Sequence, residues 1–486
     1  SGNHRETIEC NAHGRVRILQ GMHPDFFQKS LDEGESFASP EAVFTFSKEG
    51  YGGISRNMHR FVREHIVRGT WKKKERPILI NSWEAMYFDV KERKLLKLAR
   101  QAAEAGIELF VLDDGWFGAR SNDYAGLGDW VANRERLPQG IKGIADRIEE
   151  MGMKFGLWFE PEMVNKDSDL YRAHPDWILQ TPQRHSCHGR NQYVLDFSRK
   201  EVVDCIYEMM YKILSEAKVS YIKWDMNRSI TECYSAALPA DRQGEVFHRY
   251  ILGVYDLYER LNTAFPQILF ESCASGGGRF DPGILYYAPQ GWTSDDTDAA
   301  ERVKIQYGTS MCYPVSSMGS HVSVVPNHQL NRKTPLHTRA NVAYFGTFGY
   351  ELDLNKLSDE EISEVKQQIT FMKEYRELIQ FGTFYRLKSP FEGNETVWMT
   401  VSEDKKTALV FWYRERNVVN ADFTRVRLQG LDPDLIYRNE YNETENYGDE
   451  LMNLGLLTTD CTAGEPTSED EPCTDYESRI YVLTAK

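Results

Sequence analysis

Short apolar runs alternate with helical stretches over residues 76–317, and this alternation constrains the fold more than any other feature of the chain. Helical periods occupy, for example, 199–216, 243–263 and 299–310. A series of strands joined by helical crossovers predicts parallel pairing, and eight such strands predict a closed (β/α)8 barrel. A doubly wound open sheet is the alternative, but no GxGxxG motif follows any of the runs. The eight expected strands are 77–83, 107–116, 153–162, 192–197, 219–227, 267–273, 289–296 and 312–317.

The pattern changes after about residue 388. Alternating runs without a long helix between them predict an antiparallel β-sandwich, and they lie at 396–402, 407–413, 425–430 and 478–485. Residues 1–75, with a helix near 54–67, are expected to be the remnant of an N-terminal β-domain plus a linker helix. The predicted domains are therefore 1–75, the barrel at 76–387 and the sandwich at 388–486.

Charge and cysteine content narrow the range of partners. The chain has 58 Lys and Arg against 73 Asp and Glu, a net charge of −15, which disfavours nucleic acid as a partner. No run of 18 apolar residues occurs, so no membrane span is expected, and no signal peptide is visible, although the first residue is Ser. Eight scattered cysteines without CxxC spacing indicate reduced thiols and a cytoplasmic location, with a Cys461–Cys473 disulfide as an alternative.

Nearly every expected strand ends in polar or aromatic side chains. In a (β/α)8 barrel the carboxyl ends of all strands meet on one face, where active sites are found. The sequence therefore predicts a shared site on this face. Its candidate residues are Trp83, Asp113, Asp114, Trp158, Glu160, Asp225, Asn227, Cys273 and Asp295.

Asp225 and Asp295 are the two carboxylates on which the predicted chemistry depends. They follow the fifth and the seventh expected strands, and we expect them to meet from opposite sides of the barrel mouth. Retaining glycoside hydrolysis needs such a pair, about 5–5.5 Å apart, with one nucleophile and one acid/base. Lys223 lies on the same side of its strand as Asp225 and would keep that carboxylate ionised. A purely structural ion pair between Lys223 and Asp225 is the alternative.

Two further stretches suit a sugar ligand. Asp113 and Asp114, in "LDDGWFG", can accept paired hydrogen bonds from neighbouring hydroxyls; a metal site or a helix N-cap are the alternatives. The glycines of "FESCASGGGRFDPG", at 270–283, allow backbone amides to approach a ligand, although a plain loop is also consistent. Trp83 and Trp158 fit either a ligand wall or the protein core.

Seven motifs in order carry a resemblance to a known family: "NSWEA", "LDDGWFG", "GLWFEPEMV", "HGRNQYVLD", "YIKWDMNR", "ESCASGGGRFD" and "WTSDDTDA". They resemble the bacterial α-galactosidases of glycoside hydrolase family 36, from about residue 40 to the C-terminus. The resemblance implies a (β/α)8 catalytic domain, a C-terminal β-sandwich and a retaining double displacement without metal or organic cofactor. It also implies a large N-terminal β-domain, of which this chain is expected to hold only the last strands.

The resemblance also implies roles for individual residues. Asp225 would be the nucleophile and Asp295 the acid/base, and the neighbours Asp296 and Asp298 are expected to raise the pKa of Asp295. Binding of the galactose hydroxyls is implied for the remaining positions. Asp113, Asp114 and Lys223 would contact the 4- and 6-hydroxyl side, Arg190, Asn227, Cys273 and Gly276 the 2- and 3-hydroxyl side, Trp158 would form an apolar wall, and Trp83 would lie near the entrance. Cys273 is thus expected to be a ligand-contacting thiol, not half of a disulfide.

The expected activity is that of an exo-acting α-galactosidase on melibiose- or raffinose-type sugars. Its expected partner is a galactoside or an oligosaccharide, and assembly into a homo-oligomer stays open. Three other functions also stay open: a galactosyltransferase of the raffinose-synthase type, an α-N-acetylgalactosaminidase, and a galactose-binding fragment without turnover. Trp158 and Cys273 match the galactose-type pattern, and both candidate catalytic aspartates are present.

Overall fold

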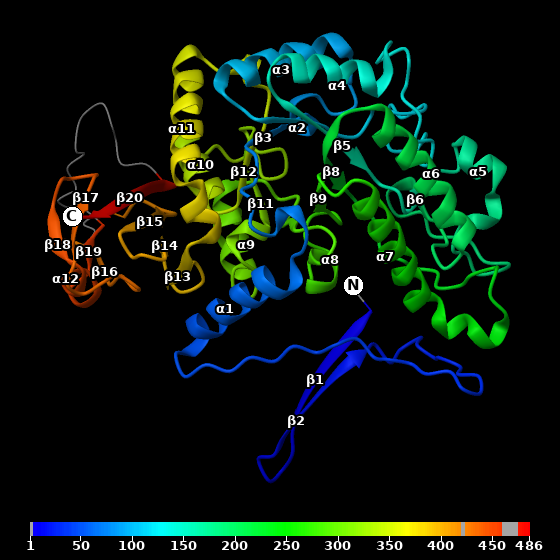
Figure 1. The fold of residues 1–486 in the computed structure, drawn as a ribbon, viewed down its shortest axis with the longest axis horizontal. Helices are drawn as coiled ribbons and strands as arrows, with labels where there is room; N and C mark the ends of the chain where they lie inside the picture. Colours follow the sequence, from blue (N-terminus) through cyan, green and yellow to red (C-terminus); the bar gives the residue numbers. More distant parts are fainter. Residues whose placement is uncertain (1–2, 419–422, 459–474) are drawn as a thin grey trace.

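The centre of the molecule is a closed barrel of eight parallel strands (Figure 1). A computed structural model describes residues 3–418, 423–458 and 475–486. Each barrel strand pairs with the next along the chain, and the last pairs with the first, which confirms the predicted (β/α)8 barrel. The strands are β3 (Leu79–Asn81), β4 (Leu109–Leu112), β5 (Lys154–Phe159), β8 (Val219–Trp224), β9 (Leu269–Ser272), β10 (Gln290–Trp292), β11 (Met318–Ser323) and β12 (Thr347–Glu351).

Two of the expected strands were assigned wrongly. Within 192–197, β7 (Tyr193–Val194) pairs antiparallel with β6 (Met163–Val164), so both belong to a ribbon in the long connection after β5. The run at 312–317 contains a short 3-10 helix, and the barrel strand β11 begins directly after it. The closing strand β12 was not predicted. Asp225 therefore follows the fourth barrel strand and Asp295 the sixth, with only β9 between their strands, so they do not come from opposite sides of the mouth.

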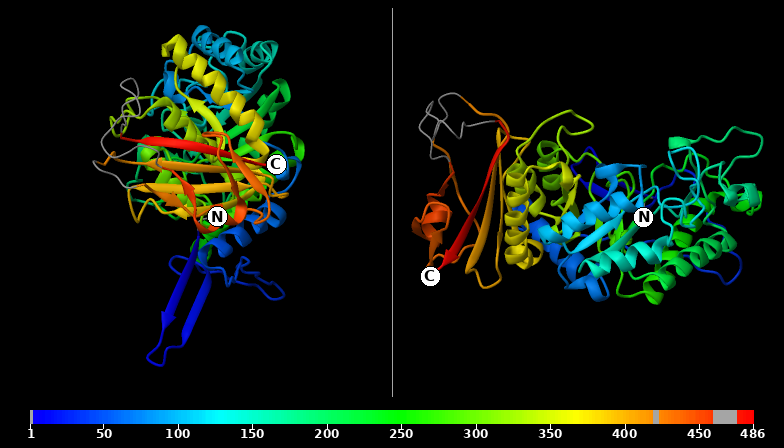
Figure 2. Two further views of the ribbon diagram at one scale, coloured as in Figure 1. Left: turned by 90° about the vertical axis from the view of Figure 1, so that its left-hand side faces the viewer. Right: turned by 90° about the horizontal axis from the view of Figure 1, so that it is seen from above.

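Helices surround the barrel (Figures 1 and 2). The first of them, α3 (Glu92–Ala105), buries one face that includes Leu95 and Leu98, and it ends at Gly106, whose φ of 94° suits a left-handed cap. The last, α11 (Asp359–Phe381), begins with a capping box formed by Ser358 and Glu361. The others are α4 (Gly140–Glu150), α6 (Lys200–Glu216), α7 (Val246–Ala264), α9 (Ala299–Thr309) and α10 (Leu336–Tyr344), with the short α2 (Trp83–Met86), α5 (Asp169–Ala173) and α8 (Pro282–Leu285) in connections.

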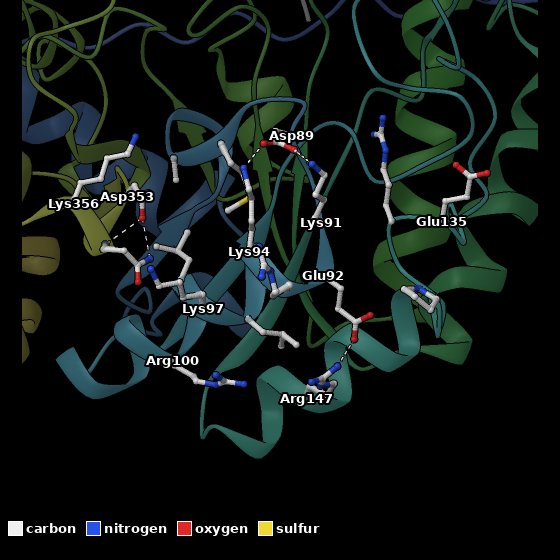
Figure 3. Close-up of a pocket in the computed structure, with 18 residues that line it drawn as sticks. Asp89, Lys91, Glu92, Lys94, Lys97, Arg100, Glu135, Arg147, Asp353 and Lys356 are labelled. Atoms are coloured by element: carbon white, nitrogen blue, oxygen red, sulfur yellow. Dashed lines mark hydrogen bonds and ion pairs between the residues drawn. The ribbon is translucent and has the colours of Figure 1, made fainter.

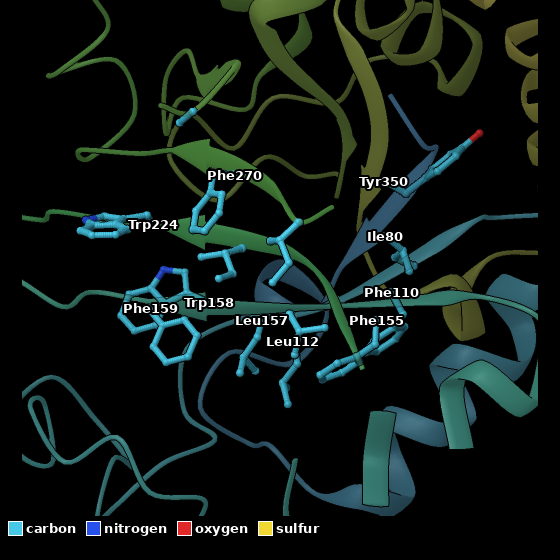
Figure 4. Close-up of a cluster of buried hydrophobic side chains, with 14 of the residues drawn as sticks. Ile80, Phe110, Leu112, Phe155, Leu157, Trp158, Phe159, Trp224, Phe270 and Tyr350 are labelled. Carbon is cyan, nitrogen blue, oxygen red and sulfur yellow. The ribbon is translucent and has the colours of Figure 1, made fainter. Parts of the chain in front are cut away.

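Side chains alternate between the two faces of each barrel strand. One set packs in the large hydrophobic core that the barrel strands share with the helices, and it includes Phe110, Leu112, Phe155 and Leu157 (Figure 4). The other set, from Leu79, Leu109, Val111, Tyr221 and Leu269, forms a separate buried cluster together with Trp71, which precedes the first barrel strand. Two residues further along their strands, Leu79, Val111 and Tyr221 are followed on the same face by Asn81, Asp113 and Lys223. The apolar interior thus ends where the polar site begins.

A six-stranded antiparallel sheet follows the barrel. Its strands in spatial order are β13 (Thr383–Lys388), β14 (Glu395–Val401), β15 (Thr407–Arg414), β20 (Glu477–Ala485), β17 (Ile436–Asn439) and β18 (Glu445–Tyr447). One face packs toward the barrel, where Trp398 and Phe411 contact Phe345. The other face packs on the short pair β16 (Arg425–Val426) and β19 (Leu456–Leu457), near α12 (Gly448–Asn453). This arrangement confirms the predicted C-terminal β-sandwich; its strand β13 straddles the predicted boundary at 387/388.

The N-terminal segment lies against this body at residues 28–32, where the Gln28 N–H donates to Gly244 O at 3.0 Å and Asp32 pairs with Arg242. A hairpin of β1 (His4–Cys10) and β2 (Val16–Met22) projects from the molecule, and an extended segment leads from it to α1 (Gly50–Phe61) (Figures 1 and 2). Ile8, Val16 and Ile18 of the hairpin are exposed. Among the described residues, no helix combines the length and apolar character needed to cross a membrane. The alternative Cys461–Cys473 disulfide lies outside the described residues.

Candidate active site

Lys223, at the end of β8, pairs with Asp113 and not with Asp225. Its Nζ lies 3.0 Å from Asp113 Oδ2, and only 8% and 5% of the two side chains are exposed. Asn81 Nδ2 donates a second hydrogen bond, of 2.7 Å, to the same oxygen. Burial alone would lower the pKa of Lys223, but the charges of Asp113 and then Glu351 outweigh it and hold that pKa well above its ordinary value. The site therefore contains a permanent ammonium between carboxylates.

Asp225 is buried and held by three N–H donors. Asn227 Nδ2 donates to Asp225 Oδ2 at 2.8 Å and Trp158 Nε1 donates to the same oxygen at 3.2 Å. The backbone N–H of Met226 donates to Oδ1 at 2.8 Å. Hydrogen bonds of this kind fix the orientation of the carboxylate. The geometry suits a nucleophile.

Asp295 has a different environment, although its charge interacts with that of Asp225. Its side chain reaches solvent, but protein surrounds its other sides. The resulting loss of hydration, followed by the negative charge of Asp225, raises the pKa of Asp295 above its ordinary value. The predicted direction of this shift is therefore confirmed, but its expected source was wrong: Asp298 instead caps α9 through bonds of 3.0 and 3.1 Å and pairs with Arg332.

The other predicted sugar-contacting acid is braced by the protein. Asp114 accepts hydrogen bonds from two nitrogens of Arg120. Nε lies 3.0 Å from Oδ1 and 3.1 Å from Oδ2, and Nη2 lies 2.8 Å from Oδ2. Both side chains are buried. Burial raises the pKa of Asp114 and the Arg120 guanidinium opposes that shift. The adjacent "DD" pair thus separates into Asp113, which is tied to Lys223, and Asp114, which is tied to Arg120.

The glycine-rich loop after β9 lies against the loop that carries Asp295. Gly276 has a φ of 84°, and a Cβ at this position would lie 2.5 Å from Ser294 Cα, so only glycine fits. The Gly276 N–H donates to Cys273 Sγ at 3.4 Å. Burial, then the charge of Asp225, raises the pKa of the Cys273 thiol well above its ordinary value. Cys273 is a free thiol, as expected.

Trp158, Trp83 and Arg190, the predicted aromatic and basic contacts of the sugar, lie in three different environments. Trp158 is 2% exposed, and its ring lies parallel to that of Phe117, so its indole N–H, directed at Asp225, is its clearest link to the site. Trp83 follows β3, is half-buried and packs edge-on against Tyr87. Arg190 is exposed, with a φ of 52°, and its charge acts on Asp295. Their contacts with a sugar remain predictions.

Sequence reasoning missed Glu351 and His321, on the last two barrel strands, and Glu84, in α2. Glu351 ends β12, is 3% exposed and lies 3.1 Å from His321 Nδ1 of β11. Glu84, in α2, accepts a 2.8 Å hydrogen bond from Thr297 Oγ1. Burial, then the charge of Glu351, raises the pKa of Glu84 to about 8. Because β12 was not recognised as a barrel strand, nothing in the sequence placed its carboxylate at the mouth.

A hollow of about 1110 Å³ lies elsewhere, between α3, the turn before α4 and residues 353–356 (Figure 3). Its lining is rich in lysine and arginine, and several of these side chains, such as Lys91 and Lys94, pair with Asp89. None of the candidate sugar-site residues lines it. The hollow therefore does not belong to the candidate active site.

A (β/α)8 barrel that carries two electrostatically linked aspartates, an ammonium and an indole at its strand ends has the architecture of a glycoside hydrolase. The sequence model described as Melibiase matches residues 36–382, and that of the glycosyl hydrolase family 36 C-terminal domain matches 395–483. The chain therefore belongs to the melibiase family, glycosyl hydrolase family 36.

Similar proteins agree with this assignment. The chain is 53% identical over 456 residues to "Alpha-galactosidase AgaA" of Geobacillus stearothermophilus. The aligned region covers 94% of this chain and 62% of that protein. "Alpha-galactosidase Mel36A" of Lactobacillus acidophilus is 49% identical with the same coverages. The crystal structure of AgaA superposes with a TM-score of 0.95 at 50% identity, covering 99% of this chain and 65% of that chain. The chain thus spans less than two thirds of these relatives.

Proposed function

We propose that this chain is a retaining exo-α-galactosidase that removes terminal α-linked galactose from oligosaccharides of the raffinose type. The observation that carries the proposal is the contrast between two linked aspartates. Asp225 accepts three N–H hydrogen bonds that fix its orientation, whereas loss of hydration and the charge of Asp225 raise the pKa of Asp295. Such different environments of two carboxyl groups distinguish a nucleophile from an acid/base.

Complexes of a related protein support the substrate class. AgaA variants carrying one substituted aspartate each have been crystallised in complex with raffinose and with stachyose. The two substituted aspartates lie 70 positions apart in that protein, the same separation as Asp225 and Asp295 in this chain. Free thiols at Cys205, Cys233 and Cys273 support a reducing compartment, and we propose the cytoplasm.

In the proposed mechanism, Asp225 attacks the anomeric carbon while Asp295 protonates the leaving oxygen. A β-linked galactosyl-enzyme forms, and Asp295 then removes a proton from the attacking water, which releases α-galactose. Lys223 and Asp113 bind sugar hydroxyls at the floor of the site. Because Asp295 must hold a proton and its pKa is raised, the alkaline limb of the kcat/KM profile lies above the ordinary aspartate value of 3.8.

Turnover of nitrophenyl α-galactoside, measured beside the α-N-acetylgalactosaminide and the β-galactoside, tests the proposal. We expect cleavage of the first alone, with α-galactose as the first product. Asp225→Gly should lose about 10³-fold or more and form β-galactosyl azide when azide is added. β-Galactose as the first product, or an α-azide, would overturn the role of Asp225. Predominant galactosyl transfer to added sucrose acceptor over water would instead identify a transferase.

A further inference from the structure

Glu160, at the end of β5, is a fully buried carboxyl group that the proposed chemistry does not use. Its Oε1 accepts hydrogen bonds from the backbone N–H of Asn227 and from Gln192 Nε2, both at 2.5 Å. Its Oε2 accepts a third, of 3.2 Å, from Asn227 Nδ2. Glu160 therefore binds the residue that contacts the candidate nucleophile.

The Asn227 side chain bridges two carboxyl groups. One hydrogen of its Nδ2 points to Glu160 and the other to Asp225 Oδ2 at 2.8 Å. Its Oδ1 accepts a 3.2 Å hydrogen bond from Ser275 Oγ. Turning the amide over would place Oδ1 against Glu160 Oε2 and Asp225 Oδ2 and lose both Nδ2 hydrogen bonds. The acceptor at Glu160 thus helps decide which end of Asn227 faces Asp225.

The protonation of Glu160 fits this arrangement. Burial, followed by the negative charge of Asp225, raises the pKa of Glu160 to about 8, and the N–H bonds from Asn227 oppose the shift. Below that pH Glu160 adds no full second charge beside Asp225. Its oxygens can still accept hydrogen bonds in the neutral form.

We propose that Glu160 is a positioning residue, which orients the Asn227 amide so that it donates to the Asp225 nucleophile. Glu160 does not touch the sugar in this scheme. Glu160 acts through Asn227 on the orientation and the ionisation of the Asp225 carboxylate. The inference rests on the proposed function, because it assigns Glu160 a part in that reaction.

Glu160→Gln tests the proposal with little change in volume. The new amide nitrogen cannot accept from Asn227 Nδ2, so the Asn227 amide turns and presents Oδ1 to Asp225. Loss of a hydrogen bond to a charged group predicts a fall in kcat of roughly 10- to 100-fold, with KM changed less than about threefold. The acidic limb of the kcat/KM profile should move to higher pH, because the ionised form of Asp225 loses a donor.

Two comparisons separate positioning from general support of the fold. Glu160→Gln in an Asn227→Ala background should cost less than about threefold, because the route through Asn227 is already absent. Glu162→Gln is the matched control: Glu162 is equally buried but contacts Arg279, Trp224 and Tyr250. It should lower the unfolding midpoint without moving the acidic limb.

An equal loss from Glu160→Gln in both backgrounds, or an unmoved acidic limb, would overturn the inference. If the wild-type chain turns over no galactoside, the proposed function fails by itself. Crystal structures of the wild type and Glu160→Gln then still decide the geometric claim. An Asn227 amide that keeps its 2.8 Å contact with Asp225 Oδ2 in Glu160→Gln would refute it, because a turned amide would place two oxygens against each other there.

Discussion

Replacing Lys223 with methionine should separate the structural and the functional work of the ion pair at the floor of the site. At the observed 3.0 Å and an effective dielectric constant of about 20, the attraction between Lys223 and Asp113 is about 5.5 kcal/mol before desolvation. Lys223→Met leaves the Asp113 carboxylate buried and without its cation. Breaking a buried pair from one side costs about 3–5 kcal/mol. The urea midpoint, followed by tryptophan fluorescence at pH 7, should fall accordingly.

A second substitution separates the effect of the ion pair on stability from its effect on catalysis. Adding Asp113→Asn to Lys223→Met removes the stranded charge, and Asn81 Nδ2 can still donate to the new amide oxygen. The unfolding free energy should then return to within about 1–2 kcal/mol of the wild type, because a neutral replacement avoids the desolvation cost. Turnover of the galactoside should stay down by orders of magnitude, since both hydroxyl-binding groups are gone.

The control for this cycle is an exposed pair. Lys200 Nζ lies 2.6 Å from Asp204, but the Lys200 side chain is 82% exposed. Lys200→Met should cost less than about 1 kcal/mol. If Lys223→Met lowers the unfolding free energy as little as this control does, the reasoning from burial is wrong. If the double variant regains wild-type turnover, the sugar-binding role of the pair is wrong.

Three further perturbations follow from contacts in the structure. Gly276→Ala, with φ 84° and a Cβ 2.5 Å from the neighbouring backbone, should lower kcat/KM at least about tenfold, whereas Gly308→Ala in α9 meets nothing within 4 Å and should not. Arg279→Met strands Glu162, which it holds by two 2.8 Å bonds, and should lower unfolding free energy by about 3–5 kcal/mol in urea titrations. Because the pKa of Glu84 is raised from 4.5 to about 8, its stabilising proton is lost as pH rises; unfolding free energy should fall across this window, and Glu84→Gln should flatten the fall.

The sequence predicted the barrel and the main acidic residues because both depend on local patterns. Asp225 and Asp295 follow short apolar runs, and parallel strands of any number bring such ends together. The count of eight strands was right, but one strand was assigned wrongly because "QYVLDF" has the composition of a buried strand, although its partner is the nearby β6. The closing strand "TFGYE" is short and contains a glycine, so its apolar pattern is weak.

Partners of charged groups were harder to predict than their positions. Lys223 was expected to face Asp225 from sequence spacing, yet the barrel brings Asp113, which follows β4 two strands away, to 3.0 Å. The choice depends on the register between strands distant in sequence, which the pattern of one strand does not contain. The bracing of Asp114 by Arg120 and of Asn227 by Glu160 depends on connections between strands and was not predicted for the same reason.

The sheet that follows the barrel has two buried faces, and this has a consequence for how the molecule unfolds. Trp398, Phe411 and Phe384 of that sheet belong to the same apolar core as the barrel helices. Heating cannot detach the sheet without exposing this aromatic layer to water, which opposes a stepwise loss of the C-terminal part. Amide hydrogens of β14 and β15 should therefore exchange at the same free energy as those of the barrel strands, as members of one cooperative unit.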